Sequence, residues 1–283
     1  MKSILQNSKI FGRSIKMLVF SLIILVSTNF AFGQITLNKT VVPKSTCNQY
    51  DVTLQITGVS TATPLDVILV IDRSGSMADG SPSSMSHAKN AAISFVRKLF
   101  SPANNPGNIN RVAIVSYSSY ATEDIQLSYA ADSTLIISKI NNLVASGSTN
   151  IADGFYQASK EMKTRGRTTC NVIRSIVLLT DGVANMGSTF ASGNDRYEGS
   201  CTNTPTSPTA CTISAYTRGQ ESQSYTVGSV TYTNKVYSIG LFGGISGGIQ
   251  TLAANTLNSA QNSGFFQTET AADLTGIYNQ IFG

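Results

Sequence analysis

The strongest constraint on the fold is a repeating pattern that begins at Leu65: a short run of Val, Ile and Leu, then a stretch with helical periodicity. Strands of a parallel sheet are covered on both faces, so they appear as continuous apolar runs rather than as alternating ones. We therefore predict an α/β fold with a doubly wound, mostly parallel sheet and helices on both faces. The predicted strands are 67–71, 112–115, 173–179 and 236–241, and the predicted helices are 85–100, 135–143, 151–162 and 271–282.

Three segments depart from this pattern. Residues 120–129 are polar and alternating, which favours an antiparallel edge strand paired by a hairpin with the preceding strand. Residues 184–233 are rich in Ser, Thr, Gly and Asn and have almost no apolar period, so we expect a polar insertion or long loop there. Residues 34–62 contain short alternating runs and predict a small β-rich appendage, which leaves residues 63–283 as the main domain.

Residues 1–33 have the three parts of a secretory signal peptide. A basic leading region precedes the apolar run 17–26, and Ala31 and Gly33 place small residues where a signal peptidase reads. We expect cleavage before Gln34 and a secreted or cell-surface protein with no stable membrane span. An uncleaved anchor is the alternative, but the apolar run has about ten residues, whereas a span takes about twenty.

Removal of this segment leaves the chain almost neutral. The segment holds 4 of the 20 basic residues and none of the 15 acidic ones, so the net charge falls from +5 to about +1. The sequence pI of about 9.0 therefore gives no reason to expect nucleic acid binding.

All four cysteines follow the signal segment, and an even number in an oxidising compartment favours disulfides. Cys201 and Cys211 flank a Thr- and Pro-rich loop, and a bond between them would stabilise a segment with little core of its own. We predict this pair and leave the pairing of Cys47 and Cys170 open. The four cysteines lack the paired spacing of a zinc site.

Three loops at the strand ends carry oxygen ligands. Asp72, Ser74 and Ser76 follow the first apolar run, Thr149 precedes the helix that begins at residue 151, and Asp181 follows the run 173–179. The carboxyl ends of parallel strands face one crevice, so we expect these side chains to converge. Two carboxylates and three hydroxyls suit a small hard divalent cation, Mg²⁺ first, with Mn²⁺ or Ca²⁺ as alternatives. A partner's Asp or Glu carboxylate would complete the shell of such an ion.

The series Asp72-x-Ser74-x-Ser76, with Thr149 and Asp181 in later loops, resembles the metal-ion-dependent adhesion site of von Willebrand factor type A domains and integrin inserted domains. The resemblance covers about residues 65–282 and includes all five motif positions in order. It implies that the two serines and Thr149 contact the ion, while the two aspartates orient the shell through water. The competing interpretation treats these residues as turn formers and helix caps, but their joint occurrence favours the site.

The resemblance implies an exported adhesion module that binds a protein partner through the cation. The first alternative is a structural tip or assembly module of a larger surface protein or polymer. The second is a metal-assisted hydrolase, which we do not expect because no His, Cys or Lys is placed as a base beside Ser74 or Ser76. The only histidine, His87, is interpreted as a surface residue.

Overall fold

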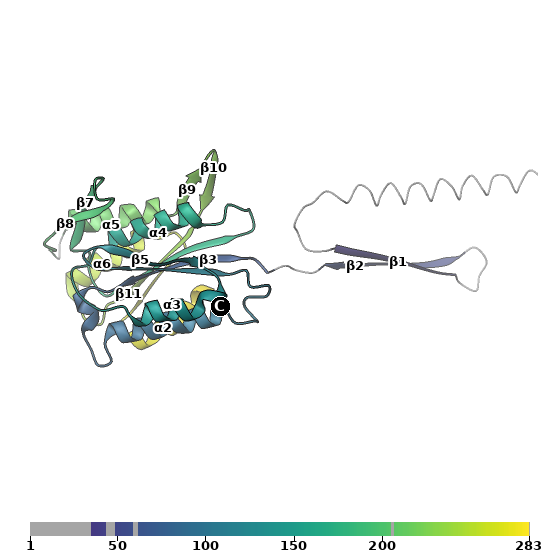
Figure 1. Ribbon diagram of the computed structural model, residues 1–283, viewed down its shortest axis with the longest axis horizontal. Coiled ribbons are helices and arrows are strands. Elements are labelled where there is room, and N and C mark those ends of the chain that lie inside the picture. Colours follow the sequence, from purple (N-terminus) through teal and green to yellow (C-terminus); the bar gives the residue numbers. More distant parts are fainter. Residues whose placement is uncertain (1–34, 44–48, 59–61, 205–206, 283) are drawn as a thin grey trace, which may run out of the picture. The chain divides into compact units, whose positions relative to one another are not determined.

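The computed structural model describes residues 35–43, 49–58, 62–204 and 207–282 (Figure 1). The chain divides into two compact units, residues 1–61 and residues 62–283. The predicted signal segment and Cys47 lie outside the described residues.

The first unit is a two-stranded antiparallel sheet of β1 (Ile35–Pro43) and β2 (Tyr50–Gly58). Val41 pairs with Val52, so the two side chains lie on the same face of the hairpin. Both are exposed, as are Leu37 and Leu54 on that face. The predicted β-rich appendage is therefore present as an amphipathic hairpin.

The second unit is built on a six-stranded sheet in the order β12-β11-β6-β3-β4-β5. Neighbouring strands are parallel except for β5, which runs antiparallel to β4 at the edge, as predicted. The sheet comprises β3 (Leu65–Asp72), β4 (Arg111–Tyr117), β5 (Ala121–Ser128), β6 (Ile173–Thr180), β11 (Lys235–Leu241) and β12 (Gly264–Thr268).

Helices cover both faces of this sheet (Figure 1). Alternate residues of β3 point to opposite faces, so Leu69 joins one hydrophobic cluster and Val70 the other, and both are completely buried. One cluster contains side chains of α2 (Ser84–Leu99), α3 (Ser133–Asn141) and α7 (Leu274–Phe282). The other contains side chains of α4 (Ile151–Arg165), α5 (Ala210–Glu221) and α6 (Gly247–Ala260). The predicted doubly wound architecture is confirmed.

The expectation of a long loop at residues 184–233 is wrong. The segment contains two antiparallel hairpins, β7 (Met186–Ala191) with β8 (Arg196–Ser200) and β9 (Ser224–Val227) with β10 (Val230–Thr233), and α5 lies between them. Periodicity missed α5 because few of its side chains are buried, among them Cys211 and Ala215. Such a narrow apolar stripe is enough once tertiary packing stabilises the helix.

The predicted disulfide joins Cys201 to Cys211 and ties the end of β8 to the first turn of α5. In the described part of the chain Cys170 is a free, exposed cysteine. No helix in the described ranges is both long and apolar enough to cross a membrane.

A buried ion-pair network holds the amino end of β3. Asp66 is completely buried and accepts hydrogen bonds from Arg111 (Nε, 2.8 Å) and Arg167 (Nε, 3.0 Å). Burial alone would raise the pKa of Asp66, but the two arginines outweigh it and lower that pKa below its usual value. The carboxylate therefore contributes to folding in its charged form.

Candidate metal site at the carboxyl ends of the strands

The order of the strands reverses beside β3. The chain passes from β3 to β4 on one side and later returns to β6 on the other side of β3. Ligands of open α/β sheets bind in the crevice at such a reversal, outside the carboxyl ends of the strands. Asp72 is the last residue of β3 and Asp181 directly follows β6, so both lie at this crevice.

Asp72 is completely buried and is held through both carboxylate oxygens. Oδ1 accepts a hydrogen bond from the backbone N–H of Ser74 (2.7 Å), and Oδ2 accepts one from the Thr180 hydroxyl (2.6 Å). Thr180 is a positioning residue that the sequence analysis missed. The sequence feature that could have identified Thr180 is its position as the last residue of β6, directly before Asp181.

The two serines and the second carboxylate continue this chain of hydrogen bonds. A short 3-10 helix, η1 (Gly75–Ala78), starts after Ser74, and the turn brings the Ser74 and Ser76 hydroxyls to 3.2 Å of each other. The Ser76 hydroxyl donates to Oδ1 of Asp181 (2.8 Å). The structure thus brings four of the five predicted residues together. Ser76 is exposed, so the site opens to solvent on this side.

Thr149, the fifth predicted residue, lies on the adjoining loop. The backbone N–H of Gly75 donates to the carbonyl of Gly147 (2.9 Å), which holds the two loops together. Gly147 has φ +83°, and a Cβ there would lie 2.8 Å from Oγ of Ser119, so this position favours glycine. Thr149 is buried, and its N–H donates to Oδ1 of Asn185 (2.8 Å), a second positioning residue that the sequence analysis missed.

Burial disfavours the charged form of both carboxylates of the site, and the charge of Asp72 acts further on Asp181. Burial raises the pKa of Asp72. Burial and the nearby Asp72 charge raise the pKa of Asp181 from 3.8 to about 7. A divalent cation between them would offset both negative charges, so these shifts fit an ion at this position.

The donor set also fits a hard cation. No group of three or more His, Cys, Asp or Glu side chains placed to hold a metal occurs within the described ranges. The candidate site instead combines two carboxylates with hydroxyl-bearing side chains, an all-oxygen set of the kind that Mg²⁺, Mn²⁺ and Ca²⁺ accept. The hydroxyls of Ser74 and Ser76, now bonded to each other, would turn their lone pairs to the ion.

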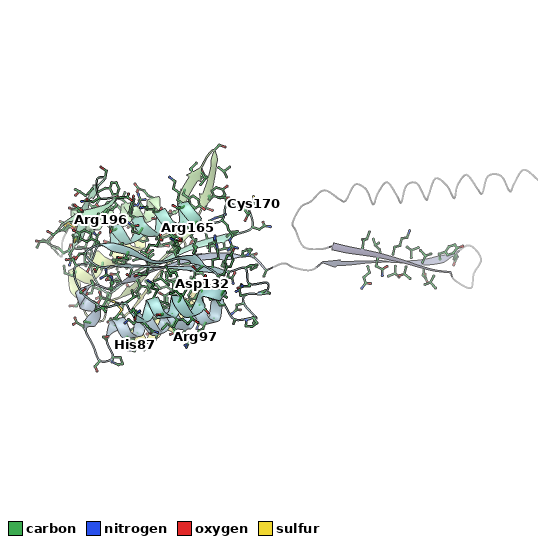
Figure 2. The ribbon with its side chains drawn as sticks, viewed as in Figure 1. His87, Arg97, Asp132, Arg165, Cys170 and Arg196 are labelled. Carbon is green, nitrogen blue, oxygen red and sulfur yellow. A yellow bond between two sulfur atoms is a disulfide. The ribbon has the colours of Figure 1, made fainter. Side chains whose placement is uncertain are left out.

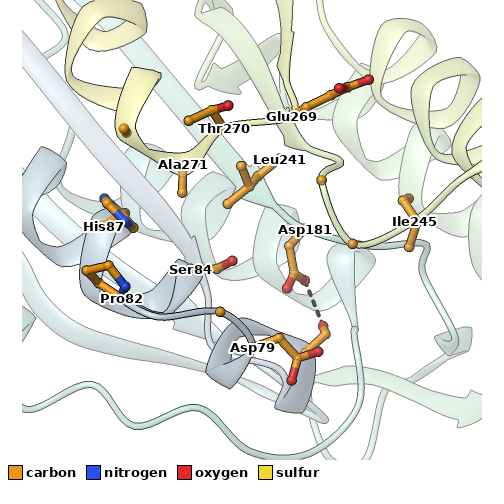
Figure 3. A pocket seen from close by; sticks show the side chains of 15 residues that line it. Asp79, Pro82, Ser84, His87, Asp181, Leu241, Ile245, Glu269, Thr270 and Ala271 are labelled. Carbon is orange, nitrogen blue, oxygen red and sulfur yellow. Dashed lines mark hydrogen bonds between the residues drawn. The ribbon is translucent and has the colours of Figure 1, made fainter.

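A cavity of about 360 Å³ adjoins the site and shares Ser76 and Asp181 with it (Figure 3). His87 is partly buried in its wall, on the opposite side from Asp181. The other lining residues come from the η1–α2 segment, the loop after β11 and the segment after β12: Asp79, Gly80, Pro82, Ser84, Leu241, Gly243, Gly244, Ile245, Glu269, Thr270, Ala271 and Ala272.

The β7–β8 hairpin is fastened to the same end of the sheet. The Asp153 carboxylate on α4 accepts a hydrogen bond from the backbone N–H of Tyr197 (2.9 Å), and the Asn150 side chain donates to the Tyr197 carbonyl (2.9 Å). Figure 2 shows Arg196 of β8 at the same end of this unit as His87. The hairpin therefore borders the candidate site.

Residues 67–183 match the family model of the von Willebrand factor type A domain. The match supports this family for the α/β unit. The match runs from within β3 to just after β6 and includes the five predicted residues of the candidate site. A curated relative, the minor fimbrium subunit Mfa5 of Porphyromonas gingivalis, is 32% identical over 138 residues, which are 48% of this chain but only 11% of that protein.

Solved structures share the α/β fold of this chain. The type V pili tip protein Mfa5 of P. gingivalis, solved as three N-terminal domains, superposes with a TM-score of 0.58 at 18% sequence identity. The aligned region covers 87% of this chain and 55% of the solved Mfa5 chain. The pilus adhesin SpaC of Lactobacillus rhamnosus GG superposes with a TM-score of 0.59 at 17% sequence identity. The aligned region covers 89% of this chain and 34% of the SpaC chain.

Proposed function

We propose that the protein is exported and acts at the cell surface as a metal-dependent binding module. Its von Willebrand factor A unit holds a divalent cation, Mg²⁺ in the first instance, and the ion completes its shell with an Asp or Glu carboxylate of a protein partner. The ion is held by five side chains: Asp72, Ser74, Ser76, Thr149 and Asp181.

The chain of hydrogen bonds that joins Asp72, Ser74, Ser76 and Asp181 at the carboxyl ends of β3 and β6 carries this proposal. It gathers oxygen ligands from two separate loops around one point, and the exposure of Ser76 leaves that point accessible. Turn formers and helix caps bond to the backbone of their own loop. The side-chain bond between Ser76 and Asp181, 105 positions apart, joins two separate loops, which a turn former or helix cap does not explain.

The names of the relatives support adhesion rather than catalysis, because they are a fimbrial subunit, a pili tip protein and a pilus adhesin. A role in assembly of a larger surface polymer is the second candidate. It is favoured by the exposed apolar face of the β1–β2 hairpin, since an isolated hairpin of two strands is marginally stable in water. In both candidate functions, adhesion and assembly, the binding partner is a protein.

Thermal unfolding with Mg²⁺ and with chelator tests the cation site. An ion at a hundredfold excess over its dissociation constant adds about 2.7 kcal/mol to the free energy of unfolding. This raises the melting temperature of a domain of this size by about 5–10 °C. Asp72→Ala should abolish the rise. Asp132→Ala, which removes an exposed carboxylate at the end of η2 (Ala130–Asp132, Figure 2), should keep it.

Capture of partners from surface extracts tests the binding role. We expect wild-type protein to retain a partner in Mg²⁺ and to release it in chelator, and Asp72→Ala to retain none. Capture that survives chelator would overturn the metal-dependent mechanism and direct attention to the β7–β8 hairpin.

Export has its own test, the amino-terminal sequence of protein recovered outside the cell. A start at or near Gln34 supports cleavage of the signal segment, with allowance for a cyclised glutamine. Membrane-bound material that starts at Met1 would contradict it.

A further inference from the structure

Two residues of the candidate metal site, Ser76 and Asp181, also line the cavity beside it. A partner carboxylate that completes the shell of the ion therefore has its neighbouring residues over this cavity. With a volume of about 360 Å³, the cavity lies at the lower end of the range of small-ligand pockets. This volume has room for a long side chain of the partner.

The charges that line the cavity are mostly negative. Asp79 and Glu269 are exposed lining residues, and neither forms an ion pair within the described part of the chain. Neither Lys nor Arg occurs in the lining. Asp79 lines the same cavity as Asp181, a residue of the candidate metal site.

A bound divalent cation would offset Asp72 and Asp181 but not Asp79 and Glu269. The partner's carboxylate then adds one more negative charge at this end of the unit. A positive side chain in the cavity would compensate these charges, whereas a second acidic side chain would be repelled. Electrostatic complementarity of this kind sets which partners are accepted.

The remaining walls suit the stem of a basic side chain. Leu241, Ile245 and Pro82 line the cavity with apolar surface. Figure 3 shows Leu241 and Asp181 facing the same space. Lys and Arg bury a hydrocarbon stem against apolar atoms while the charged group stays near water and carboxylates.

We propose that this cavity binds a Lys or Arg side chain of the protein partner, on a residue close in sequence to the carboxylate that binds the ion. The preferred ligand is thus a loop that carries an acidic and a basic residue near each other. This inference rests on the proposed cation-dependent function. It adds that the site prefers partners in which a basic residue, rather than a neutral or acidic one, lies close in sequence to the carboxylate that binds the ion.

The test uses the full chain and three sets of fluorescent cyclic peptides made of Gly and Ser with a single Asp. The sets carry Lys, Gln or Glu at one, two or three positions from the Asp, and binding is followed by fluorescence polarisation in saturating Mg²⁺ and in chelator. We expect the best Lys peptide to bind about fivefold more tightly than its Gln counterpart, as for a favourable exposed ion pair. The Glu counterpart should bind least, and added salt should reduce the preference.

Charge variants connect this preference to the cavity. Asp79→Asn combined with Glu269→Gln should bring the Lys and Gln peptides to the same affinity, with Mg²⁺ set to saturation for each variant. Asp132→Asn removes an exposed carboxylate outside the cavity and should keep the preference.

The outcomes separate this inference from the proposed function. If Mg²⁺ raises the melting temperature but the Lys peptides bind no better than the Gln peptides, or no peptide binds at millimolar concentration, the basic-residue inference is overturned and the cation site stands. A Lys preference that survives in the double variant also overturns it. If Mg²⁺ produces no stabilisation, the proposed function fails, and the inference fails with it.

Discussion

The stability of the metal-free protein should become less dependent on pH when Asp181 is replaced by asparagine. Burial and the charge of Asp72 raise the pKa of Asp181 from 3.8 to about 7. The native carboxyl therefore keeps its proton up to about pH 7, whereas the unfolded chain loses it near pH 4. An asparagine side chain at this position would have a similar shape and no proton to lose.

The sign and size of the effect follow from proton linkage. Between about pH 4 and about pH 7 the native state binds more protons than the unfolded chain, so the wild-type free energy of unfolding falls as pH rises. The difference of about 3 units between the native and unfolded pKa of Asp181 corresponds to a loss of up to about 4 kcal/mol in the wild-type free energy of unfolding. The stability advantage of Asp181→Asn over wild type should therefore grow by up to this amount across the window.

Denaturant unfolding in chelator, at several pH values from about 4 to about 8, measures this difference. Asp132→Asn is the matched control, because its carboxyl is exposed at the surface and should give a difference that does not change with pH. Saturating Mg²⁺ should remove most of the wild-type decline, since the ion offsets the charge that forms. An Asp181→Asn advantage that stays constant or shrinks as pH rises would refute the reasoning.

Three further predictions concern the fold. Asp66→Asn leaves two arginines without their buried partner and should cost about 3–5 kcal/mol near neutral pH. The cost should shrink as pH falls below about 4, because Asp66 of the unfolded chain takes up its proton there while the native carboxylate, whose pKa is lowered, stays charged to a lower pH; denaturant unfolding at several pH values measures both. Cys201→Ser with Cys211→Ser should lower the unfolding free energy by about 2–3 kcal/mol, and non-reducing peptide mapping should find the two cysteines linked. Gly187→Ala should lower the melting temperature, because Gly187 has φ +94° and a Cβ there would lie 2.2 Å from Oδ1 of Asn150. Gly193→Ala is the control, because a Cβ at Gly193 would meet no atom within 4 Å.

The sequence alone predicted five of the six strands of the central sheet, while β12 was not predicted. Strands covered on both faces must be apolar throughout, so the runs at 67–71 and 173–179 marked β3 and β6 without reference to distant contacts. Parallel strands end at a common edge, so the same reasoning predicted that Asp72 and Asp181 would meet there. The antiparallel edge strand β5 followed from its polar alternation in the same way.

Only the tertiary structure decided how the site is supported and what surrounds it. Thr180 holds Asp72 across 108 positions of sequence, and Asn185 holds Thr149 across 36, and no local periodicity encodes such pairs. The cavity is formed by four segments that approach each other only after the sheet is assembled. Residues 184–233 have weak periodicity because their hairpins and α5 are short and bury few of their side chains completely. Packing on the sheet and the Cys201–Cys211 bond, rather than local propensity, stabilise them.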